Sequence, residues 1–150
     1  MALLNLSRAE IDFLAQPLGT ESASIFVTRL TQGLADTLHA RLRTRVRLLP
    51  RPHRAMPVTV PHWRVSPELS GLWLMRRLGA SGPGRIEHVP PALLRTLDAV
   101  LAERWLDAPA TVPEGCAWQI AAGFPGAVLE LDLPGSPVEM QRWAQETIRS

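Results

Sequence analysis

The sequence predicts an α/β or α+β sandwich, a single domain in which helices pack against one β-sheet. Apolar residues recur every three or four positions in some segments, as in helices, and at every second position in others, as in strands. These segments follow one another as helices, strands, helices, a hairpin and a helix, without an internal repeat of roughly 20 to 50 residues. A chain of 150 residues is long enough to bury an ordinary core without disulfides.

The first segment with a clear pattern is a short helix near the start of the chain. Ser7 and Glu10 form a capping box, in which a hydroxyl and a carboxylate each pair with a free backbone N–H of the first turn. An apolar stripe follows, formed by Ile11, Leu14, Ala15 and Leu18. We expect residues 1–19 to form a recognition helix and residues 20–150 the domain. Two partners fit the stripe equally well: another protein, or the core of this chain.

A longer helix is expected from Thr20, because apolar residues then recur at helical spacing as far as Leu42. After it the period changes to two, and Arg43, Arg45 and Arg47 alternate with smaller or apolar residues. This alternation predicts a strand with one buried face, ended by prolines. The segment AMPVTVPHWRV predicts a second strand, which we expect at an edge of the sheet because its two prolines lack N–H donors.

Two well-marked helices come next. Ser66 is the expected N-cap of the first, with Pro67 in its first turn and Gly79 as its stop signal. The second begins in the segment VPPALL and runs to Trp105. We expect the two to pack as antiparallel neighbours, joined by the glycine-rich loop GASGPG.

The last third of the chain predicts a β-hairpin and a closing helix. The hairpin turns between Gly123 and Gly126, and alternation then places three leucines on one face of its second strand, at positions 129, 131 and 133. A second capping box, from Ser136 to Glu139, starts the final helix.

Candidate catalytic groups are few, so we predict no enzyme, no cofactor and no metal site. Histidines 39, 53, 62 and 88 lie far apart, without a cysteine or carboxylate at ligand spacing, and are expected to be isolated imidazoles. Cys116 is expected to be a small buried apolar residue, because no activating base lies near it in the sequence. The GASGPG loop lacks the Lys-Ser/Thr pair of a phosphate-binding loop and does not follow a strand.

The arginine-rich run around residues 41–54 is the strongest local charge feature. Arg43, Arg45 and Arg47 would share one strand face and could protect a sheet edge, dock an acidic protein surface or bind nucleic acid. Nucleic acid is the less favoured partner, because no aromatic residue for base stacking is interleaved and the net charge is only +2.

Composition favours a cytoplasmic protein. All 16 basic residues are arginine, there is a single cysteine, and neither a signal peptide nor an apolar run of about 18 residues is present. We therefore expect no insertion into a membrane.

The opening run LSRAEIDFLA resembles the motif at the start of FliM, the flagellar switch protein. The matching residues are Leu6, Ser7, Glu10, Ile11, Asp12 and Leu14. The later order of a long helix, a basic strand, two helices around a glycine-rich turn, and the strand in AVLELDLPG is similar to the FliM middle domain. SctQ proteins of type III secretion share that pattern, and the fold implied is a CheC-like sandwich.

The resemblance implies a non-enzymatic scaffold subunit of a cytoplasmic ring, located at the inner-membrane base of a flagellar switch or a secretion apparatus. The implied partners are an SPOA-domain (FliN-like) ring protein, further copies in a homo- or hetero-oligomer, and a phosphorylated CheY-like response regulator. Glu10, Ile11, Asp12 and Leu14 would contact that regulator, with apolar anchors and charge steering.

Two features depart from the family pattern. No SPOA domain fits after Trp143, which implies a fragment or a shortened form. The CheC phosphatases need a Glu-x-x-Asn signature, and the one asparagine here, Asn5, lies outside such a motif, so a CheC-like phosphatase is the less favoured alternative.

Overall fold

The computed structural model describes residues 18–105, 112–121 and 124–149, with side chains from residue 24 onward. The helix predicted near the start, with its site residues Glu10, Ile11, Asp12 and Leu14, lies outside the described residues. The described elements are α2 (Leu18–Leu42), β1 (Leu48–Pro50), β2 (His62–Val65), α3 (Pro67–Arg77), α4 (Pro91–Trp105), β3 (Gly115–Ile120), β4 (Val128–Asp132) and α5 (Pro137–Arg149).

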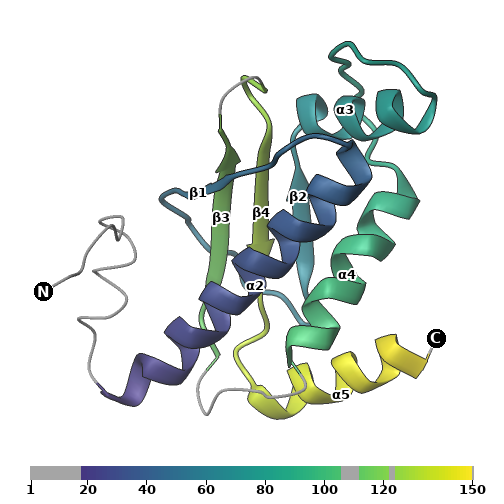
Figure 1. Cartoon of the computed structure of the whole chain (residues 1–150). Coiled ribbons are helices and arrows are strands. Elements are labelled where there is room, and N and C mark those ends of the chain that lie inside the picture. The colour runs from purple at the N-terminus through teal and green to yellow at the C-terminus, as the bar shows by residue number, and fades with distance from the viewer. Residues whose placement is uncertain (1–17, 106–111, 122–123, 150) are drawn as a thin grey trace, which may run out of the picture.

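The four strands form one antiparallel sheet in the order β1-β3-β4-β2. Helices α2 and α4 lie over one face of this sheet, α5 runs beneath them, and α3 lies across the opposite end (Figure 1). The predicted α+β sandwich is confirmed. Of the described helices, none combines the length and the apolar character that a membrane span requires.

The core lies between this sheet face and the helices. The apolar stripe of α2 from Leu30 to Leu42 is fully buried, as are Leu129 and Leu131 of β4. Two indole N–H groups tie the layers together: Trp118 Nε1 of β3 donates to the Thr31 hydroxyl at 2.9 Å, and Trp63 Nε1 of β2 donates to Asp98 at 2.8 Å.

The predicted N-cap hydroxyls of Ser66 and Ser136 are confirmed. The Ser66 hydroxyl accepts the N–H of Leu69 at 3.3 Å, and it also accepts the N–H of Val128 at 2.9 Å, which joins the start of α3 to β4. At the start of α5, the Ser136 hydroxyl accepts the N–H of Glu139 at 3.3 Å.

The first two strands are shorter than predicted. Helix α2 is followed by Arg43, whose left-handed backbone (φ 55°) turns the chain away from the helix axis. Residues 45–47 precede the strand, so β1 has only three residues. The edge position of β2 is confirmed, but only His62–Val65 pairs with β4. Because Pro57 and Pro61 cannot donate to a ladder, residues 51–61 instead return irregularly from β1 to β2 across the sheet (Figure 1).

The expected antiparallel pairing of α3 with α4 is wrong. Helix α4 packs against α2 and α5, whereas α3 packs against the end of α2. The thirteen-residue connection through Gly79, whose φ of +80° suits glycine, lets the chain change direction between the two helices. This divergence leaves a groove between α2, α3 and α4.

Candidate functional site

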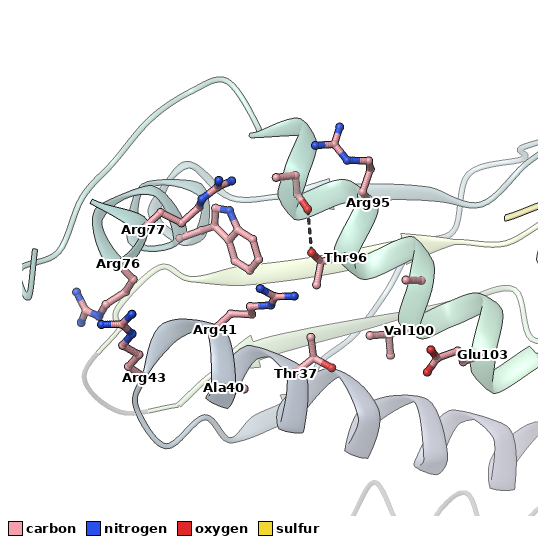
Figure 2. A pocket seen from close by; sticks show the side chains of 13 residues that line it. Thr37, Ala40, Arg41, Arg43, Arg76, Arg77, Arg95, Thr96, Val100 and Glu103 are labelled. Carbon is pink, nitrogen blue, oxygen red and sulfur yellow. Dashed lines mark hydrogen bonds between the residues drawn. The ribbon is translucent and has the colours of Figure 1, made fainter. Parts of the chain in front are cut away.

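The most distinctive surface feature is a groove of about 700 Å³ where the ends of α2 and α3 meet α4. We call it the arginine groove, after the five arginines that line it: Arg41, Arg43, Arg76, Arg77 and Arg95. Figure 2 shows Arg41 reaching from α2 into the space before α4, with Arg43 and Arg76 at one end and Glu103 at the other.

Local physics explains why α2 and α3 bring arginines here. Arg41 lies in the last turn of α2, and Arg76 and Arg77 lie in the last turn of α3. A cation in the last turn of a helix is stabilised by the unpaired carbonyls and the negative end of the helix dipole. Two helix ends that converge therefore concentrate positive charge.

Arg76 is held in place by three backbone carbonyls. Its Nε donates to the carbonyl of Leu42 at 3.1 Å, and its Nη1 donates to those of Ala80 and Gly82 at 3.1 and 3.0 Å. The side chain thus caps the end of α2 and orders the loop after α3. Its positive charge is fixed in position at the edge of the groove.

The groove is strongly unbalanced in charge. Glu103 is the one carboxylate among its lining residues. The Glu103 carboxylate lies 4.0 Å from the guanidinium of Arg104, a residue that does not line the groove. Within the described part of the chain, none of the five groove arginines forms an ion pair. The arrangement is chemically suited to hold an anion.

Two other lining residues bear on what the groove can do. Trp73 is 4% exposed, and its Nε1 has no hydrogen-bond partner among the described residues. The Thr96 hydroxyl is committed, because it donates to the carbonyl of Ala92 at 2.9 Å (Figure 2).

The predicted arginine row is only partly brought together. Arg43, Arg45 and Arg47 are all exposed, but Arg43 alone lines the groove. Arg45 and Arg47 alternate with the buried Val46 and Leu48, as the sequence predicts. The three arginines do not share one strand face, however, because Arg43 lies in a left-handed turn and the other two precede β1. The signal that could have revealed Arg76 and Arg77 is their position at the end of a well-capped helix, but nothing in the sequence placed Arg95 beside them.

A second polar cluster lies on the other side of the sheet from the core. Asp132 of β4, 1% exposed, lies 3.1 Å from His53 Nε2 and 3.3 Å from Arg64 Nη1, and it accepts the N–H of Met56 at 3.2 Å. Arg64 also pairs with Glu130 at 2.8 Å. The expectation that His53 is isolated is wrong, because the irregular segment carries it onto carboxylates almost 80 residues away in sequence.

This cluster anchors residues 51–61 to the sheet. The His53 side chain is 8% exposed and lies against Gly115, where a Cβ would overlap the imidazole. Neither imidazole nitrogen makes a well-aligned hydrogen bond, so the contact with Asp132 is a close polar contact without directed geometry. The cluster supplies attachment between the segment and β4.

Cys116 is buried, as predicted. Burial raises the pKa of its thiol to about 12, which makes it unreactive at neutral pH. Among the described residues, no three histidine, cysteine or carboxylate side chains gather as metal ligands.

The chain matches no family model, no curated protein and no solved structure. The likeness to the FliM middle domain and the CheC-like fold accordingly stays a prediction from the sequence.

Proposed function

We propose that this protein is a non-enzymatic binding module whose arginine groove docks an acidic segment of a partner protein. One observation carries the proposal: five arginines that pair with no carboxylate of the described residues share one groove, whose lining includes a single carboxylate. Such a surface attracts an acidic chain during encounter and fixes its register on docking.

The shape of the site favours a protein segment over nucleic acid. The groove lies between helices, where side chains of a short segment fit. Its aromatic residue, Trp73, is 4% exposed and offers no face on which a base could stack. The net charge of +2 supplies no general field toward a polyanion.

The lining chemistry favours binding over catalysis. Guanidinium groups stay charged at every physiological pH and neither donate nor accept protons in a reaction. Lining residues of the groove include no histidine or cysteine, and the hydroxyl of Thr96 is bonded to a backbone carbonyl.

The assembly we propose follows from the sequence resemblance. The module would be a scaffold subunit of a cytoplasmic ring, in a flagellar switch or a type III secretion apparatus, bound to an SPOA-domain protein. The segment with Glu10, Ile11, Asp12 and Leu14 would bind a CheY-like regulator. Co-expression with the SPOA-domain protein of the same genome, followed by size-exclusion chromatography with light scattering, tests this assembly. A stable complex is expected, and separate elution would overturn it.

The groove itself is tested with a fluorescein-labelled peptide rich in glutamate and aspartate, by fluorescence polarisation on the full chain. Arg41→Glu/Arg77→Glu is expected to weaken binding by at least about tenfold. Arg54→Glu/Arg142→Glu changes the net charge equally at exposed sites outside the groove, and is expected to weaken binding by no more than about twofold.

Two results would contradict the proposal. Equal losses in the two double variants would show that only net charge matters. Tighter binding of a single-stranded RNA of equal charge, abolished by Arg41→Glu/Arg77→Glu, would assign the groove to nucleic acid instead.

A further inference from the structure

We infer that the anion recognised in the arginine groove is a phosphate monoester on a side chain of the partner segment. This inference rests on the proposed function and names the chemistry that the groove selects. It depends on the number of groove arginines without an ion pair to a described carboxylate, and on the fixed position of one of them, Arg76.

The charge count favours a dianion. A carboxylate offers one negative charge and two oxygens, whereas a phosphate monoester carries about −1.5 to −2 at pH 7 and three acceptor oxygens. Arginines from three separate elements line one cavity here, without an ion pair to any described carboxylate. The three oxygens of one phosphate can accept hydrogen bonds from two or three guanidinium groups at once, whereas a carboxylate has only two oxygens to share among them.

Arg76 provides a preorganised position for such a ligand. Its three hydrogen bonds to carbonyls use Nε and Nη1, so Nη2 takes part in none of them. Because one of these carbonyls belongs to Leu42, Arg76 is held next to Arg43, at the same end of the groove (Figure 2). A guanidinium that is already ordered loses little entropy when it binds an anion.

The experiment compares three fluorescein-labelled peptides of one acidic sequence, with serine, glutamate or phosphoserine at the central position. Titrated against the full chain, the phosphoserine peptide is expected to bind at least about tenfold more tightly than the glutamate peptide. Arg77→Lys keeps the charge but loses the forked geometry, and is expected to remove most of this preference. Arg54→Lys, outside the groove, is the matched control and should leave it unchanged.

Equal affinity for the phosphoserine and glutamate peptides would overturn this inference and leave the proposed function standing. No binding of any acidic peptide would overturn both. Free phosphoserine that binds as tightly as the phosphopeptide would overturn the assignment to a partner segment, in favour of a small phosphate ester.

Discussion

Replacement of Asp132 by asparagine is the sharpest test of what holds residues 51–61 to the sheet. The carboxylate is 1% exposed and lies within 3.3 Å of both His53 Nε2 and Arg64 Nη1. Asp132→Asn keeps the volume of the side chain and an oxygen that can still accept the N–H of Met56. It removes the negative charge that faces two basic groups.

The magnitude follows from burial. Loss of one member of a buried ion pair costs about 3–5 kcal/mol when the charge left behind is buried and has no other partner. The value here lies at the lower end, since the Arg64 side chain is 36% exposed and keeps Glu130 at 2.8 Å. We therefore expect the free energy of unfolding to fall by about 3 kcal/mol, which for a domain of this size lowers the melting temperature by roughly 10 °C.

Urea unfolding followed by tryptophan fluorescence measures this change. Glu87→Gln is the control, because Glu87 forms an ion pair with Arg85 at 3.2 Å but its side chain is 78% exposed. An exposed pair contributes less than about 1 kcal/mol. If Asp132→Asn lost no more stability than Glu87→Gln, the claim that the cluster anchors the segment would be refuted.

Three further predictions concern single buried or close-packed sites. Burial raises the pKa of Asp98 above its ordinary value, although the hydrogen bond from the Trp63 indole lowers it. The protonated Asp98 side chain therefore contributes fully to stability at low pH, and this contribution is lost as the pH rises. In urea titrations between about pH 3 and pH 7, Asp98→Asn should gain stability relative to the wild type as the pH rises, and a constant difference would contradict this. A Cβ on Gly71 would overlap the backbone of the loop after α3, so Gly71→Ala should cost about 1–3 kcal/mol in thermal unfolding, whereas Gly82→Ala, which meets nothing, should be nearly neutral; equal melting temperatures would refute the close approach. Because burial raises the pKa of Cys116 to about 12, its thiol should react with an aromatic disulfide reagent only after denaturant is added, and rapid reaction of the native protein would show that the thiol is accessible.

The extent of the helices was predictable because their signals are local. The N-cap hydroxyls of Ser66 and Ser136 bond to backbone groups three residues ahead, and the apolar stripe of α2 repeats every three or four residues. Such interactions form within one or two turns of the chain, whatever the rest of the molecule does. They can therefore be recognised without knowledge of the fold.

Strand lengths and the packing of α3 depended on partners distant in sequence. Residues 43–48 alternate as a strand would, but a strand exists only where another strand pairs with it, and β3 reaches only Leu48–Pro50. The direction of α3 follows from the loop through Gly79 and from the close contact of Gly71 with the chain at Gly84, which no periodicity records.

By itself the sequence determined the fold class, the N-caps of α3 and α5, the apolar stripe of α2, the edge position of β2 and the burial of Cys116. Tertiary structure alone decided the two polar sites. Arg95 joins Arg41 and Arg77 only because α3 and α4 diverge, and His53 meets Asp132 only because an irregular segment crosses the sheet. The physical reason is that charge pairing acts through space, whereas periodicity reports only neighbours along the chain.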